Sequence, residues 1–211
     1  MKTKIFRYLN SRRDKLLFPY KPYMHKYKCL YIHIPRTAGT SILSIFGEKG
    51  KGRTHFPWYI YKSADPKKFY NYFKFSFVRN PWYRLYSVYC YLLKGGNQNQ
   101  DINVSKQINS YKNFNDFIIQ GLGEGNFRNH PLFMPQSFFV ISHEGQIVVD
   151  FLGRYENLNK DFQCIARMLN IDISILPKIN ASIEYNKFNE LFFLSTKAKK
   201  IIETIYKQDI E

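Results

Sequence analysis

Short apolar runs, each followed by a helix-like segment, recur along the chain. Residues 28–34 (KCLYIHI) end at a proline, and residues 40–47 (TSILSIFG) follow with helical spacing of their apolar positions. Residues 73–78 (FKFSFV) form a second apolar run, and Asn80-Pro81 then begins an apolar-rich segment that extends to Gly95-Gly96. Such short runs are typical of buried strands, and Asn before Pro is typical of a helix start. The pattern therefore predicts an α/β fold in which a parallel sheet is flanked by helices.

Weaker patterns complete the prediction of secondary structure. We expect a helix that begins at Asp65-Pro66 and extends to about Tyr72, a surface loop over the polar residues 97–112, and a third strand over residues 146–151 (QIVVDF). Apolar residues at helical spacing predict packing helices over 114–120, 156–170 and 195–208.

Composition adds an uneven distribution of charge to this picture. The chain has 211 residues, of which 18% are aromatic, enough for one domain with a sizeable core. Its formal net charge is +16, and residues 1–94 alone hold 20 Lys and Arg against 3 Asp and Glu. A basic N-terminal half favours an anionic partner, which could be a nucleic acid, a membrane surface or a phosphorylated or sulfated small molecule.

The cysteines and the N-terminus indicate the cellular setting. Three cysteines far apart, Cys29, Cys90 and Cys164, favour neither a disulfide framework nor a zinc site, and they fit a reducing cytoplasm. The N-terminus is basic but lacks the apolar stretch of a signal peptide, and no stretch approaches 18 apolar residues. We therefore expect a cytoplasmic protein, at most peripherally attached to a membrane.

The loop between the first strand and its helix has the composition of an anion-binding loop. Residues 35–41 (PRTAGTS) lie where a parallel sheet binds ligands, beyond the carboxyl end of a strand. Small residues leave the backbone accessible, hydroxyl groups can donate hydrogen bonds, and Arg36 offers a planar cation. The alternative is an ordinary turn with a helix cap. The segment is not GxxxxGK[ST], and no evident magnesium-binding acid follows it.

The second unit repeats this arrangement. In residues 77–89 (FVRNPWYRLYSVY), Arg79 follows the strand and Ser87 lies two helical turns later. Singly, Arg79 reads as a surface charge and Ser87 as a packed helix residue. Together they could bind a second phosphate.

With these two motifs the chain resembles the carbohydrate sulfotransferases that use 3′-phosphoadenosine 5′-phosphosulfate (PAPS), in the branch related to heparan sulfate 2-O-sulfotransferase and its bacterial homologues. The resemblance extends from about Lys26 and includes residues 130–136 (HPLFMPQ) and 149–162 (VDFLGRYENLNKDF). It implies a P-loop-like sulfotransferase fold over residues 26–211, preceded by a basic extension over residues 1–25.

The resemblance also implies roles for individual residues. The first loop would hold the 5′-phosphosulfate, with Arg36 in place of the family's usual lysine and as the cation that stabilises the leaving phosphate; Arg79 and Ser87 would hold the 3′-phosphate. The donor-binding residues so implied are Arg36, Thr37, Ala38, Gly39, Thr40, Ser41, Arg79 and Ser87. No metal is required, because arginines and backbone amides can meet the charge of the donor.

Histidines are the candidates for the base that accepts the proton of the acceptor hydroxyl. His55 lies between the two phosphate motifs, where related enzymes often carry a catalytic histidine, and ranks first. His33 precedes the loop and is expected to be structural, although it stays an alternative base. His130 could contact the acceptor or serve in packing, and Ser182 is a weaker candidate contact.

We expect the product to be 3′-phosphoadenosine 5′-phosphate (PAP) and the acceptor to be a glycan, a lipid-linked sugar or a component of the lipopolysaccharide type. Two other functions stay open. A polyanion- or nucleic-acid-binding module would explain the charge, although no recognised RNA or DNA motif accompanies it. A P-loop-like nucleotide kinase would explain the anion loop, but the Walker lysine and the magnesium ligands are missing.

Overall fold

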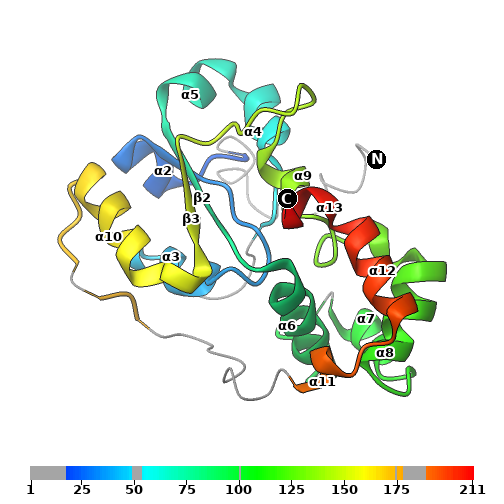
Figure 1. Cartoon of the computed structure of the whole chain (residues 1–211). Coiled ribbons are helices and arrows are strands. Elements are labelled where there is room, and N and C mark those ends of the chain that lie inside the picture. Colours follow the sequence, from blue (N-terminus) through cyan, green and yellow to red (C-terminus); the bar gives the residue numbers. More distant parts are fainter. Residues whose placement is uncertain (1–17, 49–53, 100, 174, 178–188) are drawn as a thin grey trace.

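The computed structural model describes residues 18–48, 54–99, 101–173, 175–177 and 189–211. Figure 1 shows the chain with its elements labelled. Their bounds, in chain order, are α2 Pro22–Tyr27, β1 Cys29–Tyr31, α3 Gly39–Ile45, α4 Trp58–Ala64, α5 Pro66–Asn71, β2 Phe73–Val78, α6 Pro81–Leu93, α7 Asp101–Ile108, α8 Phe114–Asp116, the π-helix η2 Phe117–Glu124, the 3₁₀-helix η3 Asn126–Asn129, α9 Ser137–Val140, β3 Phe151–Arg154, the 3₁₀-helix η4 Tyr155–Asn157, α10 Leu158–Met168, α11 Asn189–Phe192, α12 Thr196–Ile205 and α13 Lys207–Ile210.

A small parallel sheet determines where the segments that follow its strands lie. Within the described residues it has three strands in the order β1-β2-β3, with Cys29 paired to Phe73 and Phe75 paired to Phe151. Because all strands run in the same direction, the segments that follow them emerge at one edge of the sheet. The mixed α/β class, the parallel sheet and the first two strands are confirmed.

The third strand lies further along the chain than the sequence predicts. Residues 146–148 instead return toward Val140 and Ile141: Ile147 forms an antiparallel bridge with Ile141, and the Val148 N–H donates to the Val140 carbonyl. Asp150 then accepts from the Lys74 N–H, and pairing with β2 begins at Phe151. The apolar run is used in a hairpin, so the prediction for residues 146–151 is wrong except at its last residue.

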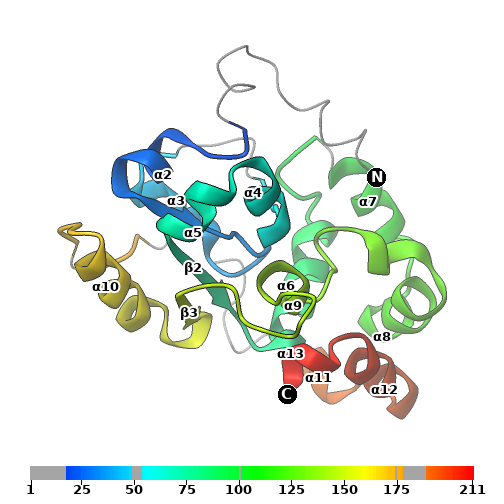
Figure 2. The same ribbon diagram turned by 90° about the horizontal axis from the view of Figure 1, so that it is seen from above.

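Helices pack in two groups, and α6 lies between them. Both views show α2, α3 and α10 beside the sheet and α7, α8 and α12 on the far side of α6 (Figures 1 and 2). Each group has its own cluster of buried side chains. One surrounds the sheet and includes Ile42 and Phe162; the other includes Leu85, Phe117 and Ile202.

The segment over residues 97–112 is not a surface loop, because it contains α7. The Asp101 carboxylate, at the first residue of α7, accepts the N–H groups of Asn97 and Gln98 in the turn that precedes the helix. Ile108 is fully buried, and the Ser105 hydroxyl donates to the Leu92 carbonyl of α6. Burial of a few positions against α6 outweighs the polar composition of the segment.

The other helix predictions are confirmed. Asn80 caps α6 by accepting the Trp82 and Tyr83 N–H groups. Asp65 caps α5 by accepting the Lys68 N–H, as predicted, and also forms an ion pair of 2.7 Å with the Lys68 ammonium group. The helices predicted at residues 114–120, 156–170 and 195–208 are present as α8 with η2, α10 and α12.

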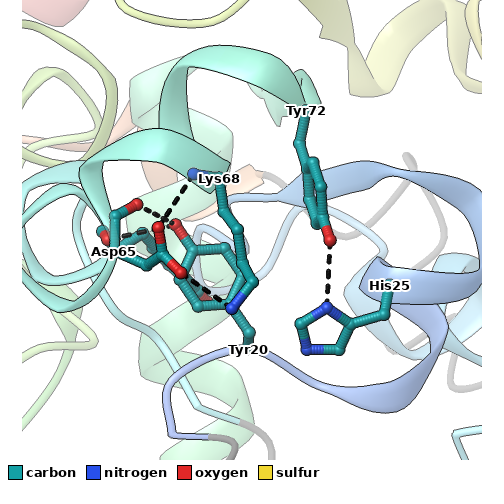
Figure 3. A network of polar contacts seen from close by, with 6 residues as sticks. Tyr20, His25, Asp65, Lys68 and Tyr72 are labelled. Atoms are coloured by element: carbon teal, nitrogen blue, oxygen red, sulfur yellow. Dashed lines mark hydrogen bonds and ion pairs between the residues drawn. The ribbon is translucent and has the colours of Figure 1, made fainter.

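A polar network joins α2 to α5 (Figure 3). The Tyr20 hydroxyl donates to the carbonyl groups of Tyr61 and Asp65, and His25 Nδ1 lies 3.0 Å from the Tyr72 hydroxyl. Tyr23 and Met24 of α2 are buried in the core around the sheet. The predicted boundary between residues 25 and 26 stays a prediction, and residues 1–17 lie outside the described part of the chain. None of the helices in that part is long and apolar enough to cross a membrane.

Candidate functional site

The loop that follows β1 has an unusual backbone. Arg36 and Ala38 both have φ of +68°, in the left-handed region, and Thr37 between them is held by a hydrogen bond from its hydroxyl to the Ile34 carbonyl, 2.9 Å long. Non-glycine residues adopt this region rarely and at an energetic cost, and two of them within three residues make the loop a candidate functional site. Left-handed residues in such loops form concave runs of N–H groups that bind anions.

Close packing beneath the loop depends on Gly39. A Cβ at this position would lie 1.7 Å from Nε2 of His33. The His33 ring, 6% exposed, stacks on Tyr31 with ring centroids 5.4 Å apart. The His33 ring therefore packs directly against the loop at Gly39, and its expected structural role stays a prediction.

The loop contacts α6 and the residue that ends the preceding segment through polar groups. Arg36 Nε donates to the Ser87 hydroxyl over 3.1 Å, and Arg79 Nη1 donates to the Arg36 carbonyl over 3.4 Å. Ser87 and Arg79 are buried, with 1% and 7% of their surface exposed. The two segments singled out in the sequence, residues 35–41 and 77–89, are thus brought together at the carboxyl edge of the sheet.

Each arginine of the site lies on a tyrosine ring. The Arg36 guanidinium is 4.7 Å from the ring centroid of Tyr91, and the Arg79 guanidinium is 4.1 Å from that of Tyr155. The Tyr91 hydroxyl in turn donates to the Asp101 carboxylate over 2.5 Å. These contacts hold both planar cations by cation–π attraction. Neither tyrosine was predicted as a site residue from the sequence, although Tyr91 follows Ser87 by four residues on α6 and Tyr155 directly follows a strand.

Positive charge is concentrated at this point. Burial, and then the nearby Arg79 guanidinium, lowers the pKa of Arg36 to about 10, which leaves it charged at neutral pH. The two like charges repel each other, and an anion that contacts both would remove this repulsion. The arrangement suits a phosphate or sulfate group.

His55 lies directly beside His33. The ring centroids of the two histidines are 4.3 Å apart, and His55 Nδ1 is 3.0 Å from the His33 carbonyl oxygen. Because a carbonyl oxygen can only accept, Nδ1 carries the proton, and in a neutral ring Nε2 then carries the lone pair. His55 thus has the tautomer that accepts a proton at Nε2.

The remaining candidates have other surroundings. His130 Nδ1 accepts the Leu132 N–H over 3.3 Å, and burial lowers the pKa of this histidine. Ser182 lies outside the described residues. Two charged residues near the site contact the backbone: the Arg84 guanidinium donates to the Leu132 and Met134 carbonyls, and Glu156 accepts the Asn80 N–H.

Residues 23–211 match the model of a family described as the Sulfotransferase family. The chain belongs to this sulfotransferase family. A protein of Archaeoglobus fulgidus with the printed name "Uncharacterized protein" is 26% identical over 129 residues, which are 61% of this chain and 93% of that protein. No solved structure matches significantly. Membership of the family indicates a transferase that moves sulfuryl groups.

The anion site fits the need of a sulfotransferase for cations that bind a negatively charged donor. Arg36 and Arg79 supply two guanidinium groups beside the left-handed backbone at Arg36 and Ala38. The Thr37 hydroxyl is fully buried and donates to the Ile34 carbonyl. Within the described residues, no group of three or more His, Cys, Asp or Glu side chains could hold a metal ion.

Proposed function

We propose that this sulfotransferase transfers the sulfuryl group of PAPS to a hydroxyl group of a carbohydrate or glycolipid and releases PAP. The observation that carries the proposal is the junction of the two motifs, where Arg36 Nε donates to the Ser87 hydroxyl and Arg79 Nη1 to the Arg36 carbonyl. We assign the chain to the P-loop-like fold and to the branch related to heparan sulfate 2-O-sulfotransferase. Its sulfotransferase domain would comprise residues 26–211, after a basic extension over residues 1–25.

The residues of the site divide between the two anionic ends of the donor. Arg36 and the loop backbone bind the 5′-phosphosulfate, and Arg79 and Ser87 bind the 3′-phosphate. Repulsion between the half-buried Arg36 and the buried Arg79 guanidinium groups supports binding of a donor that carries several negative charges, because such a donor relieves the repulsion. PAPS supplies an activated sulfuryl group, and Arg36 stabilises the charge that develops on the departing phosphate.

His55 acts as the general base in this proposal. Its Nε2 accepts the proton of the acceptor hydroxyl while the new bond from that oxygen to sulfur forms and the bond from sulfur to the phosphate oxygen breaks. The hydrogen bond from Nδ1 to the His33 carbonyl fixes the required tautomer. His33 shapes the loop and stays the alternative base, while His130 and Ser182 stay candidate contacts of the acceptor.

The acceptor is proposed to be a glycan, a lipid-linked sugar or a lipopolysaccharide-type molecule. The basic N-terminal half, which holds 20 Lys and Arg against 3 Asp and Glu in residues 1–94, favours an acidic acceptor or the surface of a membrane that carries one. We propose that the protein acts in the cytoplasm, including at the inner surface of the membrane.

The donor is tested by calorimetry with PAP, ATP-magnesium and an oligonucleotide as titrants. We expect PAP to bind tightest, and Arg79→Ala and Ser87→Ala each to weaken it by roughly 1–3 kcal/mol through loss of a charge-assisted or buried hydrogen bond. Arg154→Ala is the matched control, because Arg154 is exposed and ends the neighbouring strand. Tighter binding of ATP-magnesium would favour a kinase, and tighter binding of the oligonucleotide a nucleic-acid-binding module. Mass spectrometry of glycans and glycolipids incubated with PAPS then identifies the acceptor that gains a sulfate.

A further inference from the structure

The side chain of Gln136 binds the backbone of Arg79 at both of its polar groups. The Arg79 N–H donates to Gln136 Oε1, and Gln136 Nε2 donates to the Arg79 carbonyl, each over 2.8 Å. Gln136 is 3% exposed, so water does not compete for these bonds. The last pair of the β2–β3 ladder is Val78 with Arg154. Gln136 therefore continues the hydrogen bonding of β2 by one residue and fixes the residue that carries the guanidinium group.

Gln136 is itself held by the C-terminal helix. The Asp209 carboxylate accepts the Gln136 N–H at Oδ2 over 2.7 Å and the Ser137 N–H at Oδ1 over 2.8 Å. Three residues earlier, the Tyr206 hydroxyl donates to the Phe133 carbonyl over 2.6 Å. In Figures 1 and 2, α13 lies against α9, where these bonds form.

A primary amide is the side-chain group that suits this position. It presents one acceptor and donors, so it pairs with the N–H and the carbonyl of one residue at the same time. A glutamate carboxylate could accept from the Arg79 N–H but would face the Arg79 carbonyl with a second acceptor. An alanine would leave both buried backbone groups of Arg79 without this partner.

We propose that Gln136, oriented by Asp209, is a positioning residue for Arg79 and thereby for recognition of the 3′-phosphate of the donor. The inference rests on the proposed function, in which Arg79 binds that phosphate. The path runs from Asp209 on α13, through the backbone and amide of Gln136, to the backbone of Arg79, whose guanidinium reaches the Arg36 carbonyl. The C-terminal helix thus takes part in the geometry of the donor site without contacting the donor.

The test compares two nucleotides that differ in the 3′-phosphate. Dissociation constants of PAP and of 5′-AMP are measured by calorimetry for wild type, Gln136→Ala and Gln136→Glu, and melting temperatures are recorded in parallel. We expect affinity for PAP to fall about tenfold in both variants, as small displacements of a positioned group allow, while affinity for 5′-AMP changes less than about twofold. Gln208→Ala is the control, because Gln208 is exposed on the same helix as Asp209 and should leave both affinities unchanged.

Two further variants separate positioning from a general loss of stability. In an Arg79→Ala background, Gln136→Ala should weaken PAP no further, because the guanidinium that it positions is already absent. Asp209→Asn keeps the size of the side chain but loses one acceptor, so it should weaken the binding of PAP about threefold. This variant should stay folded even if Gln136→Ala does not.

The outcomes are distinct. If wild type binds PAP better than 5′-AMP and the Gln136 and Asp209 variants lose the two affinities equally, or lose neither, the positioning role is refuted and the proposed function stands. If wild type does not bind PAP, or binds it no better than 5′-AMP, the proposed role of Arg79 falls, and this inference falls with it.

Discussion

Replacement of Gly39 by alanine tests the packing beneath the anion loop. Gly39 is the first residue of α3, and alanine is the better helix former by about 1 kcal/mol, so the helix alone predicts stabilisation. The structure instead predicts that the substitution destabilises the protein, because the new Cβ would lie 1.7 Å from Nε2, 2.2 Å from Cδ2 and 2.4 Å from Cε1 of His33. Contacts between non-bonded carbon atoms are normally about 3.5–4.0 Å.

The His33 ring must therefore move by well over an ångström to admit the methyl group. Its surroundings oppose this movement, since Tyr31 stacks on it and His55 lies 4.3 Å away between ring centroids. Overpacking of this kind costs about 1–3 kcal/mol. We expect Gly39→Ala to lower the free energy of unfolding by that amount and also to weaken the binding of PAP, because the loop backbone shifts with the ring.

Denaturant unfolding, followed by circular dichroism, measures the change in the free energy of unfolding. Thr40→Ala, at the next position of α3, is the control for stability alone and should leave the free energy of unfolding nearly unchanged. In the double variant Gly39→Ala, His33→Ala the methyl group has room, so the double variant should be more stable than the sum of the single effects predicts. A Gly39→Ala protein as stable as wild type, with unchanged binding of PAP, would refute the packing argument.

Three further predictions concern single side chains. Arg36→Lys should retain considerable activity, because the family commonly has lysine there, whereas Arg36→Ala should lose donor affinity and turnover in steady-state assays; full activity of the alanine variant would remove Arg36 from the mechanism. His55→Ala should bind PAP normally by calorimetry and lose about 10²–10⁴-fold in turnover; if His55 is dispensable and His33 is essential for turnover but not for binding, the base is His33. Burial and then Lys68 lower the pKa of His25, so stability that is present above about pH 6.5 should be lost as the pH falls toward the folded-state pKa. His25→Gln should reduce that loss in unfolding measured from pH 7 to pH 5, and an unchanged pH dependence would contradict the assignment.

The parts of the fold that sequence predicts well depend on local chemistry. The caps Asn80 and Asp65 act on N–H groups two or three residues away, so the starts of α6 and α5 follow from a few neighbouring letters. The run over residues 73–78 has the bounds of β2 because it is apolar, short and flanked by polar residues. By contrast, α7 depends on burial of Ile108 and on Ser105 donating to Leu92, contacts that no local pattern reveals.

The residues of the site also divide into those that local sequence predicts and those that depend on packing between distant segments. That Arg36, Arg79 and Ser87 lie together was predictable, because each follows a strand or continues the helix after one and because the two motifs carry a resemblance. The contacts that support Arg79 were not: the resemblance includes residues 130–136 and 149–162, which carry Gln136 and Tyr155, but their contact with Arg79 depends on the packing of β3 and α9. A side chain whose role is to hold another one leaves little signal in a single sequence.

The position of the site between the two buried clusters has a physical consequence. The loop that carries Arg36 packs on the cluster around the sheet, to which Ile34 and Ile42 belong, whereas Ser87 lies on α6 between Leu85 and Val88 of the other cluster. The hydrogen bond from Arg36 to Ser87 therefore joins two packing units. A donor bound by both arginines and Ser87 would contact both units at once, and ligand that binds only the folded state stabilises it by mass action. In the proposed function the 3′-phosphate contacts Arg79 and Ser87, at and on α6, and the 5′-phosphosulfate contacts the loop. On that assignment, a nucleotide with both groups should raise the free energy of unfolding more than one that lacks the 3′-phosphate, because it contacts both packing units.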